Sequence, residues 1–332
     1  MKSMSIFGAS LITSLAMAQS AGTTYSVAPA QTSERHRVKS LRIEVLSTML
    51  SSGSGVGEWG FSAVVDVDGR RILFDTGGRP EAVLKNAKEL HVDLSNIPDV
   101  ILSHHHPDHA GGLLTLRKSV LEDNKPEALA TIHVGKGIFY PRRDESGQVS
   151  ESMAKRRADF EALGGRVVEY DHAVEISPGV WLTGPVPRKH LEQNWSKGVQ
   201  VQSPDGWKED NIPEDMSLVF NTDGGLVILS GCGHSGFVNT VEYARDQVRK
   251  APLAAAIGGF HLYELPDDRL EWTAGKLKEF GIQNLLGAHC TGIEALYRIR
   301  QLTGLSRQTA SVAAVGAVFE LGKKTDPGSI AR

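Results

Sequence analysis

The stretch ILSHHHPDHAGGL, residues 101–113, places four of the chain's twelve histidines within six residues. A proline and an aspartate lie among these histidines, and two glycines follow them closely. A purification tag lies at a chain terminus and lacks such interspersed residues. The remaining interpretations are a solvated polar loop and a functional site, and the rest of the sequence favours the second.

The spacing within this cluster suits metal binding. Residues two apart in an extended chain point the same way and lie about 6.5 Å apart, so His104 and His106 can direct their rings toward one ion. The next residue is a proline, which turns the chain, and Asp108 and His109 then begin an element suited to a second ion. His105 points away, and we expect a structural role for it. Imidazole and carboxylate groups at this density suit zinc, manganese or iron.

Three more histidines follow strand-like runs in the same manner. The runs DVILS, GLVILSG, LAAAIGG and NLLGA are apolar, end in small residues, and are each followed within a few residues by a histidine: His104, His234, His261 and His289. Ligands in layered α/β proteins gather outside strand ends, where loops converge. One such histidine would be incidental, whereas four indicate a shared site.

The alternation of short β-rich and helical segments predicts an α/β fold. We expect strands over 41–48, 61–69 and 71–78, with a turn at Asp68-Gly69, and a helix over about 79–90. The run DVILS is apolar throughout and is therefore expected to be covered on both faces.

Composition excludes several classes of protein. The 36 basic and 39 acidic residues give a net charge of -3, so the chain presents no polycationic surface for nucleic acid. No apolar stretch reaches the length of a membrane span. Two cysteines, Cys232 and Cys290, are too few for a disulfide scaffold in a chain this long.

The first residues differ from the rest of the chain. Residues 1–18 have one lysine, a mildly apolar centre and small residues at Ala16 and Ala18, which is the pattern of a signal peptide. We therefore expect export, to the periplasm, with residues 19–38 as a linker. The alternative is a disordered N-terminal extension on a cytoplasmic protein.

The pattern H-x-H-x-D-H after an apolar strand, together with Asp75 in LFDTG (73–77), resembles the signature of the metallo-β-lactamase superfamily. This resemblance implies a single domain over 39–324, a four-layer αββα sandwich with a metal site at one edge. It also implies that Asp75 supports the metal-binding loop from behind. Residues 141–157 look like an exposed insertion, and 325–332 form a C-terminal tail.

Five further motifs resemble one branch of that superfamily. They are EWGFS (58–62), LTGPVPR (182–188), SGCGHSGFVNTVEYA (230–244), IGGFHL (257–262) and AHCTG (288–292). The branch includes the 7,8-dihydropterin-6-ylmethyl-4-(β-D-ribofuranosyl)aminobenzene 5'-phosphate synthases and many metal-dependent hydrolases. Trp59 stands where the branch usually has histidine, and Pro185 where it usually has glutamate, so we expect a different substrate pocket.

The resemblance implies two divalent ions, which we expect to be zinc, with manganese or iron as alternatives. The expected ligands are His104, His106 and His234 for the first ion, and Asp108, His109 and His289 for the second. Asp210 and Asp215 are oxygen-bearing alternatives to His234.

Three other residues near this site also have candidate roles. Cys232 is either a thiolate ligand or a small buried residue in a tight turn. His261 is either a further ligand or a catalytic acid–base group, and the second is favoured. Cys290 is expected to pack beside His289.

Candidate substrate contacts are few. Arg188 could bind a phosphate or carboxylate, although an arginine after a Pro-rich turn is often merely exposed, and His133 is a weaker candidate. Asn239 or Thr240 could cap the helix that follows, whose first amides could receive an anion.

These expectations favour a metal-dependent hydrolase that uses a metal-activated hydroxide on an ester, lactone, amide or phosphoester. Asp108 would bind metal and also steer the water, and the small-molecule substrate is expected to be anionic. A transferase like the synthases of the branch is the alternative. A non-catalytic metal-dependent binding protein is the third possibility.

Overall fold

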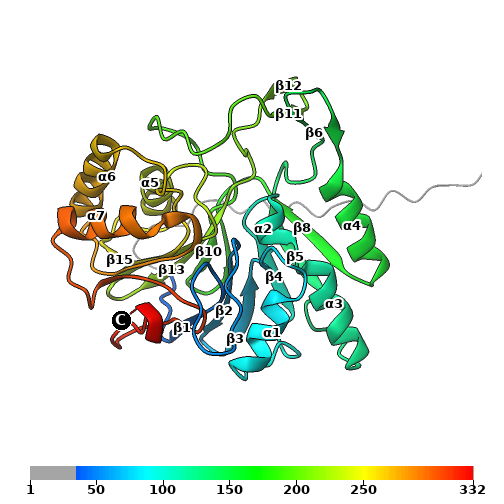
Figure 1. The fold of residues 1–332 in the computed structure, drawn as a ribbon, viewed down its shortest axis with the longest axis horizontal. Helices are drawn as coiled ribbons and strands as arrows, with labels where there is room; N and C mark the ends of the chain where they lie inside the picture. Colours follow the sequence, from blue (N-terminus) through cyan, green and yellow to red (C-terminus); the bar gives the residue numbers. More distant parts are fainter. Residues whose placement is uncertain (1–34, 332) are drawn as a thin grey trace, which may run out of the picture.

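The computed structural model describes residues 35–331. Two seven-stranded β-sheets pack face to face, and helices cover the outer face of each sheet (Figure 1). The expected signal peptide at 1–18 lies outside the described residues, as does the linker except for residues 35–38.

The first sheet has the strand order β18-β1-β2-β3-β4-β5-β8. Strands β3, β4, β5 and β8 run parallel to one another, and the pairs β18-β1, β1-β2 and β2-β3 are antiparallel. The strands are β1 (Leu41–Ser47), β2 (Ser62–Val67), β3 (Arg70–Phe74), β4 (Asp99–Leu102), β5 (Thr131–Gly135), β8 (Arg166–Tyr170) and β18 (Val318–Glu320).

The second sheet has the order β17-β16-β15-β14-β13-β10-β9. Strands β14 to β17 run parallel, whereas β13, β10 and β9 are antiparallel. The strands are β9 (Val174–Ser177), β10 (Val180–Leu182), β13 (Ser217–Thr222), β14 (Gly225–Ser230), β15 (Leu253–Gly258), β16 (Leu285–Gly287) and β17 (Ala310–Val312).

Helices form the outer layers. Figure 1 shows α1, α3 and α4 on one side of the paired sheets and α5, α6 and α7 on the other. The helices are α1 (Ala82–Glu89), α2 (Pro107–Ala110), α3 (Leu113–Glu122), α4 (Ser152–Ala162), α5 (Phe237–Gln247), α6 (Asp267–Glu279) and α7 (Ile293–Thr303), with short 3-10 turns η1 (His289–Thr291) and η2 (Ser329–Ala331). None of the helices within 35–331 has the length and apolar character to cross a lipid bilayer.

Strand alternation explains the four layers. In β14, Val227 and Leu229 point into the core between the sheets, while Leu226 and Ile228 point into the core under the helices of the second sheet. Successive strand residues face opposite sides, so a strand that is apolar throughout is buried on both faces. A third core lies between the first sheet and α1, α3 and α4. The four-layer αββα sandwich expected from the sequence is confirmed.

The local elements also follow the sequence. Strands were expected over 61–69 and 71–78 and are found as β2 and β3, joined by a tight turn. Asp68 and Gly69 both have positive φ, 46° and 83°, as a type I′ hairpin turn requires.

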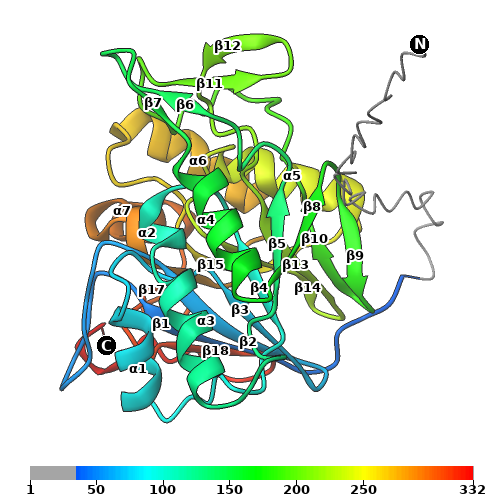
Figure 2. The same ribbon diagram turned by 90° about the vertical axis from the view of Figure 1, so that its right-hand side faces the viewer.

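A smaller sheet joins the segment 141–157 to the body of the protein. It has the order β12-β11-β6-β7 and lies at one end of the molecule (Figure 2). Its strands are β6 (Arg142–Arg143), β7 (Val149–Ser150), β11 (Gln200–Ser203) and β12 (Gly206–Glu209). Residues 144–152 are exposed, as expected for an insertion, but Arg142 and Met153 are buried. The exposed part is therefore shorter than 141–157, because its flanks are held by the small sheet and by α4.

Candidate metal centre

Histidines from both large sheets converge at the carboxyl ends of four strands. His104 follows β4 of the first sheet, and His234, His261 and His289 follow β14, β15 and β16 of the second. The ring centroids of His104 and His234 lie 4.6 Å apart, and those of His234 and His261 lie 4.7 Å apart. The four strand ends singled out in the sequence therefore form one edge of the sandwich.

The short helix α2 brings the rest of the histidine-rich stretch to the same edge. Pro107 occupies its first position, where a missing N–H costs nothing, and the first turn carries Asp108 and His109. The His109 ring lies 4.2 Å from that of His104 and 5.0 Å from that of His289. Asp108 Oδ2 lies 3.2 Å from His289 Nε2. The helix thus places a carboxylate and an imidazole against the second sheet.

His106, directly before α2, completes the cluster. Its ring centroid lies 4.6 Å from that of His104 and 4.8 Å from that of His234. The six expected ligand residues are thus all brought together by the fold.

Two groups of potential ligand atoms share one cysteine. One group is His104, Cys232 and His234, the other is His109, Cys232 and His289, and within each group the ligand atoms lie within 4.8 Å of one another. Cys232 Sγ lies 3.2 Å from His109 Nε2, and its side chain is buried. Of the two roles considered for Cys232, this position fits a sulfur ligand that faces both groups.

Unpartnered nitrogens show that the site fits a metal ion. Nε2 of both His104 and His234 is buried without a hydrogen-bond partner among residues 35–331, which is costly unless another ligand satisfies the atom. The opposite ring nitrogens are occupied, since His104 Nδ1 lies 2.8 Å from Ser103 Oγ and His234 Nδ1 contacts the main-chain oxygen of Asn194. Nitrogen and sulfur donors in this number suit zinc.

Asp75 lies behind the cluster and orients it. Its Oδ2 lies 2.7 Å from His109 Nδ1 and accepts a hydrogen bond from Ser103 Oγ at 2.8 Å, while Oδ1 accepts one from Ser103 N. A carboxylate on the far nitrogen of a histidine fixes the ring and its tautomer. A Cβ at Gly231 would lie 2.5 Å from Asp75 Oδ2, so the close approach of the next strand end requires glycine.

The protonation of the histidines differs across the cluster. Burial, with the neighbouring imidazoles, lowers the pKa of His106 to about 3 and takes the pKa of His104 and of His234 well below the usual value. These rings are therefore neutral, the form that binds metal. Burial also lowers the pKa of His109, but the Asp75 carboxylate outweighs it and raises that pKa to about 9.

Strained backbone is concentrated here. Asp75, His261 and His289 have φ of 55°, 49° and 46°, in the left-handed region that non-glycine residues seldom adopt. Such conformations persist where surrounding contacts hold them, and they cluster at functional sites. At His289 one such contact is a hydrogen bond from its N–H to Thr48 Oγ1 at 3.0 Å.

A buried ionic network supports the stretch from the outside. Glu214 is fully buried, and its carboxylate accepts hydrogen bonds from His105 N at 3.1 Å and from Arg142 Nη2 at 2.8 Å. Its Oε1 also lies 2.7 Å from His105 Nδ1. Arg142 donates in addition to Asp210 at 2.8 Å. His105 thus has the structural role expected for it, and Asp210 is bound to an arginine rather than substituting for His234.

Asp215 belongs to none of the donor groups but contacts the backbone beside His234. Its Oδ2 accepts a hydrogen bond from Ser235 N at 2.8 Å, next to His234. Burial raises the pKa of Asp215 to about 6.

An open cleft of about 390 Å³ leads to the cluster. Its lining includes His106, His234 and His261, with the aromatic side chains Trp195 and Tyr263. A small molecule therefore has access to the donor atoms.

Trp59 forms an aromatic wall at the second donor group. Its ring centroid lies 4.8 Å from that of His289 and 5.4 Å from that of Tyr263, with edge-to-face geometry. The side chain of Trp59 is 49% exposed, so a large apolar surface remains open beside the histidines.

Neither candidate substrate contact lines the cleft among the described residues, although Arg188 lies over the ring of Trp195, 5.5 Å from its centroid. Arg188 donates to the main-chain oxygens of Asn211 and Ile212 and is absent from the cleft lining among the described residues. His133 lies within β5, where its nitrogens are 2.8 Å from Tyr170 Oη and 3.0 Å from Asp99 Oδ1. Backbone and sheet contacts thus engage parts of both side chains, and their contact with a substrate stays a prediction.

The expected anion site at the start of α5 is already filled. The helix begins at Phe237, and its first amides, at Val238 and Asn239, donate to the carboxylate of Glu192 at 3.0 and 2.8 Å. Asn239 does not cap the helix, since its Oδ1 accepts from the amides of residues 189 and 190. An internal carboxylate thus takes the place that a substrate anion was expected to occupy.

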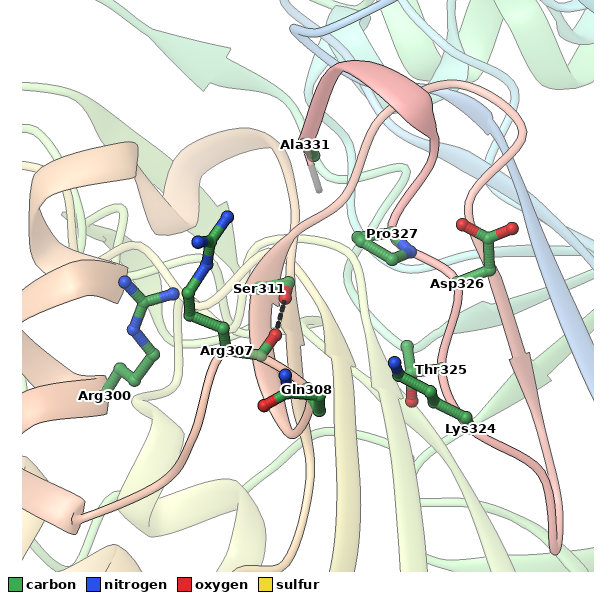
Figure 3. Close-up of a pocket in the computed structure, with 9 residues that line it drawn as sticks. All are labelled: Arg300, Arg307, Gln308, Ser311, Lys324, Thr325, Asp326, Pro327 and Ala331. Carbon is green, nitrogen blue, oxygen red and sulfur yellow. Dashed lines mark hydrogen bonds between the residues drawn. The ribbon is translucent and has the colours of Figure 1, made fainter.

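The protein has a larger cleft away from the histidines. This cleft, of about 530 Å³, lies between the end of α7 and the C-terminal segment. Figure 3 shows Arg300, Arg307 and Lys324 around it. No histidine or cysteine lines it, so its chemistry is separate from that of the metal centre.

The fold and this edge-mounted cluster define a metallo-β-lactamase-type metal centre. Residues 60–188 match the family model of the metallo-beta-lactamase superfamily, and the chain belongs to that superfamily.

Three known proteins resemble the chain in sequence or in fold. The chain is 30% identical over 243 residues to the 7,8-dihydropterin-6-methyl-4-(beta-D-ribofuranosyl)-aminobenzene-5'-phosphate synthase of Methanocaldococcus jannaschii, covering 71% of this chain and 82% of the relative. A solved metal-dependent hydrolase of the β-lactamase superfamily is similar with a TM-score of 0.69 and 26% identity, over 85% of this chain and 100% of that one. The Zn²⁺-bound PqqB of Methylobacterium extorquens shares the fold, with a TM-score of 0.50 and 17% identity over 84% of this chain and 100% of that one.

Some site residues gave little signal in the sequence. Glu214 and Arg142 are ordinary charged residues in loop-like segments, and only the fold brings them beside His105. Cys290 did carry a signal, since it adjoins a strand-end histidine much as Cys232 lies two residues before His234.

Proposed function

We propose that this chain is a metal-dependent hydrolase that holds two divalent ions, with zinc as the ion best suited to the donors. The observation that carries the proposal is the pair of donor groups that share Cys232 at an open cleft. The buried, unpartnered Nε2 atoms of His104 and His234 support it, because a bound ion would satisfy both.

The ligands divide between the two groups. His104, His106 and His234 would hold one ion, Asp108, His109 and His289 the other, and Cys232 would face both. When bound there, divalent ions supply Lewis acidity, which lowers the pKa of water and polarises a carbonyl or phosphoryl group.

Asp108 has the position of a group that orients water. Its side chain is 19% exposed, and its Oδ2 faces His289. Burial alone would raise the pKa of Asp108, but hydrogen bonding to His289 and the charge of His109 hold it well below the usual value. The group is therefore a carboxylate at any working pH and accepts hydrogen bonds.

His261 is proposed as the acid–base group on the substrate side. It lines the cleft beside Tyr263, with ring centroids 5.4 Å apart, and its Nδ1 has no hydrogen-bond partner. A positioned imidazole can donate a proton to a leaving group. The proposed substrates are esters, lactones, amides or phosphoesters small enough for the cleft.

The test combines metal content with turnover. We expect two ions per wild-type chain, about one in Asp108→Ala because one group loses its carboxylate, and a loss of orders of magnitude in hydrolysis. His172→Ala, at an exposed histidine outside the cluster, is the control and should match wild type. Full turnover by metal-replete Asp108→Ala would contradict the proposal.

A transferase is the second candidate, favoured by the 30% identity with a synthase over most of that relative's length. In this case the cleft would hold a pterin diphosphate for attack by an arylamine. Incubation with both compounds, followed by mass spectrometry, should show the joined product. Trp59 stands where the branch that the sequence resembles usually has histidine, and this difference favours a different substrate. A non-catalytic binding role is less well supported, since the cleft reaches the donors.

A further inference from the structure

A second thiol lies beside the shared cysteine. Cys232 follows β14 and Cys290 lies in η1 after β16, while β15 runs between these strands. The three strands are parallel, so their carboxyl ends meet at one edge. The two Sγ atoms lie 3.2 Å apart, and both side chains are buried.

The strand between them supplies an imidazole. His261 follows β15, and the ligand atoms of Cys232, His261 and Cys290 all lie within 4.8 Å of one another. The Nδ1 atom of His261 is buried without a hydrogen-bond partner. Cys290 belongs to neither of the two donor groups described above.

The backbone is shaped to bring these groups close. A Cβ at Gly259 would lie 2.0 Å from the main-chain oxygen of Gly231 and 2.9 Å from Cys290 Sγ. Glycine at this position therefore allows the loops after β14 and β15 to approach each other beneath the thiol. His261 itself has a left-handed backbone, which turns the chain directly after the strand.

We propose that Cys232, His261 and Cys290 form a third metal position, rich in sulfur, beside the two histidine-rich groups. Because all three groups share Cys232, an ion at this position takes the place of an ion in one of the other groups, so the total stays at two ions per chain. An ion there makes His261 a ligand instead of the acid–base group. Two thiolates and one imidazole are a soft donor set, which favours Zn²⁺ or Cd²⁺ over Mg²⁺, Ca²⁺ or Mn²⁺. Three protein ligands leave the fourth tetrahedral place open toward the cleft that His261 lines. This third position rests on the proposed metal-dependent function, because Cys232 is common to all three groups.

Cadmium tests this directly. Wild-type protein stripped of metal and given one Cd²⁺ per chain should show strong thiolate-to-cadmium absorption, and X-ray absorption should count two sulfur neighbours per ion. In Cys290→Ser the absorption should fall to roughly half, since one of the two thiolates remains. His172→Ala, at an exposed histidine outside all three donor groups, is the control and should keep both sulfurs.

The outcomes are distinct. One sulfur neighbour in the wild type, or equal absorption in wild type and Cys290→Ser, would overturn the third position while leaving the two-ion hydrolase intact. No Cd²⁺ or Zn²⁺ bound to the wild type would contradict both proposals. A Cys232–Cys290 disulfide that persists in a buffer containing a reducing agent would also overturn the third position, because neither sulfur could then bind a metal ion as a thiolate. The wild-type sulfur count does not depend on whether a variant folds.

Discussion

Replacing Glu214 with glutamine tests how strongly the buried ionic network stabilises the site. Glu214 is fully buried between His105 and Arg142. Burial alone raises its pKa, but Arg142 and then His105 outweigh burial and bring it to about 2, from a usual 4.5. A pKa lowered by about 2.5 corresponds to roughly 3 kcal/mol of stability.

The sign of the effect follows from the direction of that pKa. Because the folded pKa is depressed, the contribution is fully present above the usual pKa and is lost as the pH falls through the folded one. Glu214→Gln should therefore lower the free energy of unfolding by about 3 kcal/mol at pH 7. Near pH 3 the contribution of the charge should be about half as large or less, because Glu214 is then almost fully protonated in the unfolded chain while it is still mostly ionised in the folded protein.

Urea unfolding of both proteins at pH 7 and pH 3 measures this difference. The control is Glu161→Gln, which removes an exposed ion pair with Arg157 and should cost less than about 1 kcal/mol. If Glu214→Gln were equally destabilising at both pH values, the charge of Glu214 would not be the source, and the reasoning would be wrong.

Three further changes probe the metal centre. Asp75→Asn should weaken zinc binding by about 10- to 100-fold, because the carboxylate on His109 Nδ1 is lost; unchanged affinity in a competition titration would show that Asp75 does not orient the ring. Gly231→Ala should lower the melting temperature and the metal content, since its Cβ would lie 2.2 Å from Ser103 Oγ and 2.5 Å from Asp75 Oδ2, and a wild-type melting curve would contradict this packing. Free zinc at a thousand times its Kd should stabilise the folded protein by about 4 kcal/mol, so a chelator should lower the melting temperature and added zinc should restore it. Equal melting temperatures with and without chelator would mean that zinc does not bind the folded state.

Local sequence patterns predicted the framework of the site because the relevant signals are local. An apolar strand that ends in small residues and a histidine can be read within ten positions, and β4, β14, β15 and β16 follow this pattern. The turn at Asp68-Gly69 was predictable for the same reason. The positions of these strands within the two sheets came instead from resemblance to a family.

Contacts between distant segments could not be predicted in this way. Glu214 lies 109 residues after its partner His105. Glu192 lies 46 residues before Val238, whose amide donates a hydrogen bond to its carboxylate. Neither carboxylate stands in a motif, and each is an ordinary acidic residue until the chain is folded. Arg188 illustrates the same limit, because its sequence context is compatible with a substrate contact or plain exposure, and only the fold shows that it donates to main-chain oxygens.

The shared site has a consequence for how the two halves of the chain stay together. His109 lies in α2, which follows β4 of the first sheet, and His289 lies in η1, which follows β16 of the second sheet, 180 residues later. An ion bound by both histidines would therefore link the two sheets. Because the unfolded chain does not present this site, the free energy of binding the ion adds to the stability of the folded state. A protease that cuts within the exposed residues 144–152 would then leave two fragments that remain associated while metal is bound and separate more readily once it is removed.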